Sequence, residues 1–209
     1  MTTDDSFLHR TTLDLLDLFA AGRNTPGAGS AAALTGALAG SVLQTVARHT
    51  IKAAEGSKRR EVYAPFRERA EVILEEARNR SQSLRGAVDA DAAAFDQFWQ
   101  DRTEENLQRA TDIPIEIAGH CVALAEIGLE LHERGFRNAQ GEAAAATLSA
   151  IAGGETAAHI AHLNLRSAGA WAEERKEKIR HLRRRLRELR GLIEARIYEP
   201  DESAMLPSL

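Results

Sequence analysis

The longest stretch without a charged residue constrains the fold of this chain most strongly. Its part from Gly27 to Ala47 is 21 residues long, which is enough on paper to span a bilayer. Bulky apolar residues are few in it, and hydroxyl and amide side chains interrupt it, so insertion into lipid would be weakly driven. Small residues such as Gly36 and Gly40 would instead let neighbouring helices approach closely. We therefore expect a central helix buried in a soluble bundle.

The composition of the whole chain is typical of an all-helical protein. Of the 209 residues, 44% are hydrophobic but only 5% are aromatic, so alanine and leucine must build the core. Only five prolines interrupt the chain, and the alternation typical of strands is missing. The length allows a proper core. We predict one all-α domain over residues 1–209, an antiparallel bundle of about eight or nine helices around the central Ala/Gly-rich helix.

Charge, cysteine content and the N-terminus narrow the class of protein. The net charge of −4 argues against a dedicated nucleic-acid binder. The single cysteine, Cys121, excludes an internal disulfide framework and is normal for a reducing cytosol. The first residues lack the basic and apolar regions of a signal peptide. We expect a cytoplasmic protein that binds neither nucleic acid nor a membrane.

Apolar spacing and stop signals predict the order of the helices. The expected helices are one from Thr11 to Gly22, the central helix to about Lys52, one of more than thirty residues from about Pro65, a short one from Thr103, one from Pro114 to about Glu133, an Ala-rich piece before Gly153–Gly154 and another after it, and a last one from Trp171 to about Tyr198. Thr11 would cap the first helix, and Leu13 and Leu16 would form its apolar face. The tail from Pro200 is expected to be irregular.

The turn from Asn24 to Ser30 has a chemical interpretation. Its small residues allow backbone N–H groups to converge, and the helix N-terminus supplies partial positive charge at the same place. Together these features suit an anion. The simpler alternative is that Pro26 stops the preceding segment and that Ser30, or a glycine near it, caps the helix.

Asp91 is the best candidate for a general acid or base. It lies three residues after Val88 and four before Phe95, at the edge of an apolar helical stripe. A carboxylate near an apolar surface loses hydration, and its pKa rises toward the range useful for proton transfer. Asp89 lies on roughly the opposite side of an ideal helix. The alternative for Asp91 is a carboxylate satisfied by a neighbouring backbone or arginine.

Two patterns near the C-terminus have alternative explanations. Glu155, His159 and His162 share one helical face and could bind a metal, but no second Glu-x-x-His pair completes a site, so we expect none. A pocket wall and ordinary surface histidines remain alternatives.

Apolar residues of the last helix form an a/d pattern suited to helix packing or to a dimer seam: Ile179, Leu182, Leu186, Leu189 and Ile193. Nine Lys/Arg between Arg175 and Arg190 favour a solvated face.

Several segments resemble the cyclodeaminase/cyclohydrolase family of folate enzymes. The turn Pro26–Ser30 before an Ala/Gly-rich helix is similar to the family's Pro-Gly-Gly-Gly-Ser, with Ala28 for the middle glycine. The run Asp89–Phe95 matches Asp-x-Asp-Ala-x-Ala-Phe, and Ala110–Glu116 is similar to Ala-Thr-x-Val-Pro-Leu-Glu. These matches lie between the first helix and the middle of the chain.

The resemblance continues with departures. Residues 138–143 are similar to the family's Asn-Ala-x-Ser/Thr-Asp-Ala, with Gly141 for the hydroxyl residue and Glu142 for the aspartate. Residues 161–165 resemble Val-Arg-Ile-Asn-Leu, with His162 for the arginine and Asn164 kept. Candidates for the family's lysine-rich segment after the central helix are Lys52 and Lys58.

The resemblance implies a helical, usually dimeric protein that binds tetrahydrofolate derivatives without a metal or redox cofactor. It would hydrolyse 5,10-methenyltetrahydrofolate to 10-formyltetrahydrofolate, or close a formimino group with loss of ammonia. Asp91 would be the acid/base, supported by Asp89. The residues expected to contact substrate are Pro26, Gly27, Ala28, Gly29, Ser30, Glu142, His162 and Asn164. Arginines of the last helix would attract polyglutamate tails. A noncatalytic scaffold and a metalloprotein are the two rival hypotheses.

Overall fold

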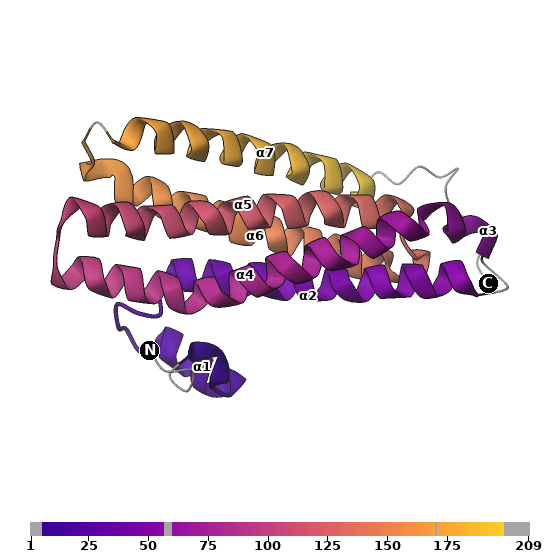
Figure 1. The fold of residues 1–209 in the computed structure, drawn as a ribbon, viewed down its shortest axis with the longest axis horizontal. Helices are drawn as coiled ribbons and strands as arrows, with labels where there is room; N and C mark the ends of the chain where they lie inside the picture. Colours follow the sequence, from indigo (N-terminus) through magenta and orange to yellow (C-terminus); the bar gives the residue numbers. More distant parts are fainter. Residues whose placement is uncertain (1–5, 57–59, 170, 199–209) are drawn as a thin grey trace.

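The computed structural model of the chain describes residues 6–56, 60–169 and 171–198, and within them every regular element is helical (Figure 1). The α-helices are α1 (Thr12–Ala20), α2 (Ala28–Glu55), α3 (Arg60–Tyr63), α4 (Arg67–Gln100), α5 (Glu104–Arg134), α6 (Gln140–Asn164) and α7 (Ala172–Tyr198). Short 3-10 turns cover Phe7–His9, Ala64–Phe66, Arg137–Ala139 and Leu165–Ser167. The all-α prediction is confirmed. Lys58 and the tail from Pro200 lie outside the described residues.

Helices α2, α4, α5 and α6 form the bundle, and α7 lies along α5 and α6 (Figure 1). The predicted central helix is α2, which contacts the other three. Gly36 explains how closely they pack, because a Cβ atom there would lie only 2.7 Å from Sγ of Cys121 on α5. Among the described residues α2 alone is long and apolar enough to cross a membrane, but 61% of its apolar window is buried inside the bundle, as expected of a core helix.

The described part of the chain forms fewer long helices than the eight or nine that the sequence predicted. The described residues contain six helices of at least nine residues, because two expected breaks do not occur. One was placed at Gly153–Gly154, which lie inside α6. A Cβ atom at Gly153 would lie 3.0 Å from the carbonyl oxygen of Ala32, and one at Gly154 would lie 2.9 Å from Leu186. These glycines permit close packing of α6 against α2 and α7 and do not end the helix.

The other expected break was at Pro114, which lies inside α5. A proline has no N–H group, so the carbonyl of the residue four positions earlier loses its helical donor. That carbonyl belongs to Ala110, and the side-chain amide of Asn164 donates to it at 2.9 Å. A residue 54 positions away thus replaces the missing bond, which explains why the helix continues.

Helix α1 differs from its prediction in the face that it buries. Thr11 caps it as expected, since the N–H of Asp14 donates to the Thr11 hydroxyl at 3.2 Å. The predicted apolar face is wrong, however: Leu13 and Leu16 are 74% and 59% exposed, and Leu15 is buried. The helix stands beside the bundle and not within it (Figure 1), so no element among the described residues covers the face that the periodicity suggested.

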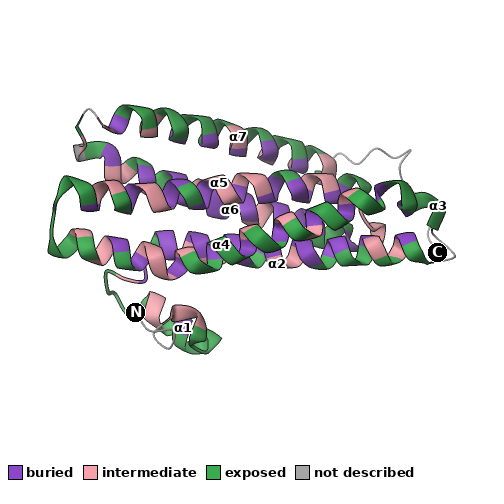
Figure 2. Cartoon of the chain, in the orientation of Figure 1, coloured by how far each residue is buried: buried purple, intermediate pink, exposed green. Residues whose placement is uncertain are grey.

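The apolar stripe of α7 faces the bundle of the same chain (Figure 2). All five residues of the a/d pattern are at most 8% exposed: Ile179, Leu182, Leu186, Leu189 and Ile193. The helix-packing alternative is therefore confirmed for them, and they are not available as a dimer seam. Ion pairs at the edges of the stripe join α7 to its neighbours: Arg175 to Asp112, Arg185 to Glu126, and Arg190 to Glu155.

Candidate functional site

The glycine-rich turn and Asp91 meet where α2 begins and α4 approaches its end. The Ser30 hydroxyl donates to Oδ2 of Asp91 at 3.0 Å, although the two residues are 61 positions apart. Gly27 caps α2 without a side-chain hydrogen bond, so a carboxylate from α4 fills that role. A Cβ atom at Gly29 would overlap the Asp91 carboxylate. The absence of a side chain at this position is therefore what lets the carboxylate reach the start of the helix.

The pKa of Asp91 results from opposing effects. Burial raises it above the usual value for aspartate, whereas hydrogen bonds from the hydroxyl and backbone of Ser30 lower it, and the net direction is upward. The free N–H groups at the start of α2 also favour the ionised form. Asp91 is half-buried, so it is both partly desolvated and accessible. This combination suits a group that exchanges protons with a bound molecule.

Two other aspartates of α4 fasten neighbouring segments. Asp89 accepts hydrogen bonds from the Ser6 hydroxyl at 2.5 Å and from the N–H of Phe7 at 2.9 Å. Asp96, which the sequence reasoning did not single out, accepts from the Thr25 hydroxyl at 2.9 and 3.2 Å. The two are seven residues apart, or two helical turns, and this spacing was the available signal. Both oxygens of Asp89 are engaged by the N-terminal segment, which leaves its proposed support of Asp91 a prediction.

The predicted substrate contacts fall at both ends of the bundle. We call the end with Gly27–Ser30, Asp91 and Asn164 the turn end. Pro26 is buried there, Ala28 is exposed at the first helical position, His162 is exposed and Asn164 is half-buried. The amide of Asn164 is occupied by the Ala110 carbonyl. This contact gives Asn164 a structural role beside its predicted contact with substrate.

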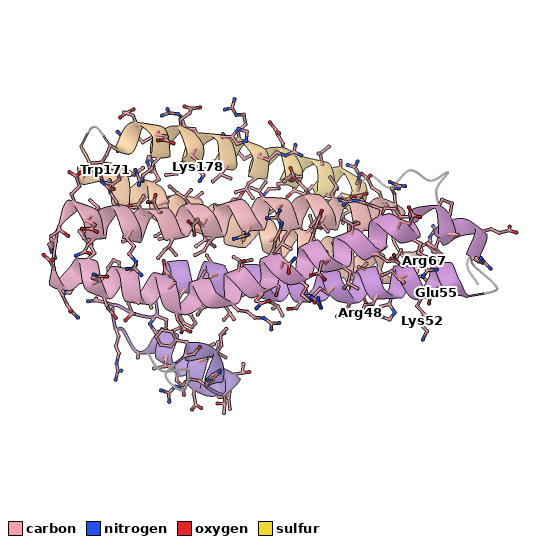
Figure 3. The ribbon with its side chains drawn as sticks, viewed as in Figure 1. Arg48, Lys52, Glu55, Arg67, Trp171 and Lys178 are labelled. Atoms are coloured by element: carbon pink, nitrogen blue, oxygen red, sulfur yellow. The ribbon has the colours of Figure 1, made fainter. Side chains whose placement is uncertain are left out.

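The remaining predicted contact, Glu142, lies at the opposite end, which we call the far end. It is in the first turn of α6, whereas Asn164 closes the same helix. The two residues are 22 positions apart, which corresponds to about 33 Å at the helical rise. Figure 3 shows Arg48 and Lys52 at the far end, beside the ion pair of Arg67 with Glu55 (3.0 Å). One chain therefore does not bring Glu142 and Asn164, both expected to contact substrate, to the same place.

The possible metal ligands are arranged differently from a metal site. Glu155 pairs with Arg190 at 2.7 Å, while His159 and His162 are exposed on α6. Within the described part of the chain, no cluster of three or more His, Cys, Asp or Glu side chains has a geometry that could hold a metal ion. Of the three residues, Glu155 therefore has a structural role in joining α6 to α7.

Comparisons with known proteins identify the family and the fold of this chain. The sequence profile of the formiminotransferase-cyclodeaminase family matches residues 11–181. A methenyltetrahydrofolate cyclohydrolase from Methylorubrum extorquens is 29% identical, over 93% of this chain and 97% of that protein. The crystal structure of formiminotetrahydrofolate cyclodeaminase from Thermotoga maritima has the same fold, with a TM-score of 0.76 at 18% identity, covering 92% of this chain and 98% of that one. The chain belongs to the formiminotransferase-cyclodeaminase family.

Proposed function

We propose that this protein hydrolyses 5,10-methenyltetrahydrofolate to 10-formyltetrahydrofolate. The observation that carries the proposal is the half-buried carboxylate of Asp91, with its raised pKa, against the glycine-rich start of α2. The name of the relative from Methylorubrum extorquens supports this choice of reaction. In this proposal the turn end is the active site, and the protein needs no metal or redox cofactor.

The chemistry requires one group that accepts and returns a proton. Water attacks the cationic carbon between N5 and N10 of the folate, and its proton passes to the Asp91 carboxylate. The hydroxyl of the resulting adduct then releases its proton to solvent as the carbonyl forms. The bond between this carbon and N5 breaks, and Asp91 returns its proton to N5. One proton is released overall, and the carboxylate is restored. Backbone N–H groups at the start of α2 orient polar atoms of the ligand.

The second candidate is closure of a formimino group with loss of ammonia. It is favoured by the likeness to the solved cyclodeaminase and by the same need for proton transfer at the one-carbon unit. Asp91 would then donate a proton to the departing nitrogen. The two reactions differ in their products, so one pair of assays separates them.

The test follows the methenyl absorbance of purified protein with substrate, beside ammonia release from formiminotetrahydrofolate. We expect the absorbance to fall faster than in buffer and no ammonia to appear. Ammonia release without methenyl hydrolysis would assign the second reaction. A rate equal to that in buffer, with folate still bound, would identify a noncatalytic binding protein and overturn the proposal.

A further inference from the structure

We infer that Arg80 of α4 and His120 of α5 form a carboxylate-binding subsite, which holds the glutamate end of a folate whose one-carbon bridge lies at Asp91. The identity of the ligand rests on the proposed function. The subsite itself follows from an unpaired cation at the α4–α5 interface. Neither residue belongs to a segment that the sequence analysis had singled out.

Arg80 is half-buried without an acidic partner. Its Nε atom is buried and has no hydrogen-bond partner, and its Nη1 atom lies 3.5 Å from Nδ1 of His120. Among the described residues, no carboxylate lies within ion-pair distance of it. Leaving a buried donor unsatisfied carries a desolvation cost, which is larger when the donor is charged. A bound carboxylate would offset this cost and match the fork geometry of the guanidinium.

Arg69, eleven residues earlier on α4, shows what a satisfied arginine looks like at the same interface. Its Nη2 and Nε atoms lie 2.8 Å and 3.0 Å from the Glu130 carboxylate of α5. Eleven residues make three helical turns, so Arg69 and Arg80 project from nearly the same side of α4. The interface therefore supplies a carboxylate to the first arginine and only an imidazole to the second. Helices α4 and α5 also separate toward the C-terminal end of α4 (Figure 1).

His120 suits the second half of such a subsite. Burial and the neighbouring Arg80 lower its pKa, although Glu116 acts in the opposite direction, so its imidazole favours the neutral form. If Nδ1 accepts from Arg80, the proton of the neutral ring is on Nε2, which can donate to an anion. The adjacent Gly119 leaves room, because a Cβ atom there would meet nothing within 4 Å.

The position of Arg80 relative to Asp91 fits one folate molecule. The two residues are again eleven positions apart, which places them on nearly the same side of α4 and about 16 Å apart along its axis. This distance is comparable with the length of an extended aminobenzoylglutamate unit. Between them lies Ala87, a small and half-buried residue that packs on the core. The aminobenzoyl ring would lie over this apolar position and the carboxylate would reach Arg80.

The experiment compares methenyltetrahydrofolate with methenyltetrahydropteroate, which lacks the glutamate. We expect the wild-type KM to be at least tenfold lower for the glutamate-bearing ligand. R80Q should bring the ratio of the two KM values close to one, R80K should restore part of it, and H120N should reduce it. The matched control is R69Q, which removes the arginine already paired with Glu130 and should keep the wild-type ratio. Circular dichroism checks folding.

Each outcome distinguishes this inference from the proposed function. A wild-type ratio near one, or an unchanged ratio in R80Q, would overturn the subsite. If the wild-type protein still hydrolyses the ligand in that case, the proposed function stands. A ratio lost equally in R69Q would show that general charge, and not this subsite, recognises the glutamate. If the wild-type protein neither binds nor hydrolyses either ligand, the proposed function fails and the subsite fails with it.

Discussion

The turn end and the far end of the bundle are held together in different ways. At the turn end, carboxylates of α4 bind three segments that precede it, through Ser6, Thr25 and Ser30. At the far end the chain between α5 and α6 packs on α2 through an aromatic contact, with the rings of His49 and Phe136 6.0 Å apart. Backbone N–H groups there donate to the hydroxyls of Thr50 and Tyr63. The half-buried acid Asp91 therefore lies at one end of a single chain, although the family-like segments occur at both ends.

The largest expected effect comes from removing the acid at the turn end. D91N should lower turnover at least about a hundredfold, because an amide cannot exchange the proton, whereas E142Q at the far end should change it less than about threefold. Steady-state kinetics of methenyl hydrolysis measures both. An equal loss in E142Q would contradict the one-ended site and would mean that the far end of another copy completes it.

The stability of D91N should not fall. Because burial raises the pKa of Asp91 in the folded state, its contribution to stability is full at low pH and is lost as pH rises through that pKa. Asparagine has no charge to desolvate, so D91N should melt no lower than the wild-type protein at neutral pH. A lower melting temperature would indicate that the ionised carboxylate is needed as the cap of α2.

A pair of glycines tests whether close approach matters at one end only. G29A should lower turnover by at least about tenfold, since the new Cβ atom must displace the Asp91 carboxylate from its position. G141A should leave it unchanged, because a Cβ atom there meets nothing within 4 Å. Both changes favour helix by up to about 1 kcal/mol, so thermal unfolding serves as the control. Full activity in G29A would show that the carboxylate need not contact the turn.

The contact of Asn164 with the Ala110 carbonyl is tested by a double-mutant cycle in urea. N164A should cost about 1–3 kcal/mol, because it leaves that carbonyl without a donor. P114A restores a backbone N–H at the position that normally serves it, so N164A should cost much less in the P114A background. An equal cost in both backgrounds would contradict this structural role, and a loss of kcat/KM in both would favour the predicted contact with substrate.

The smallest effect is a shift in pH dependence. The hydrogen bonds of Ser30 lower the pKa of Asp91, so S30A should raise that pKa further. A catalytic base works when ionised, and the acidic limb of the rate profile should therefore move to higher pH. S149A, which removes a hydroxyl bonded to a carbonyl of α6, should leave the profile unchanged. A shift of the S30A limb to lower pH would contradict Asp91 as the base.

The sequence predicted correctly several features that depend on residues close together in the chain, such as a helix cap and a buried helix. The uncharged run of small residues predicted α2, and the hydroxyl at Thr11 predicted the start of α1, because a cap and a buried face leave marks within a few residues. The turn and Asp91 were each recognised, but their contact depends on the antiparallel pairing of α2 with α4. Segment patterns contained no information on that pairing.

Three of the wrong predictions depend on how residues that are far apart in the sequence are arranged. Pro114 resembled a helix start because the donor that replaces its missing N–H, Asn164, is 54 positions from the Ala110 carbonyl that it serves. Gly153 resembled a break because the backbone that requires its small size, at Ala32, belongs to another helix. Glu142 was grouped with Asn164 because a family pattern gives the order of segments but not the end of the bundle at which each one lies.

Helices α2, α5 and α6 pack closely around Cys121, so the reactivity of this single cysteine reports on the opening of the bundle. Its sulfur would be 2.7 Å from any Cβ atom at Gly36, and burial raises the pKa of the thiol to about 12. Thiolate is therefore scarce at neutral pH, and no reagent has room to reach the sulfur while the three helices stay together. The rate at which a thiol reagent modifies the native protein measures how often these helices separate.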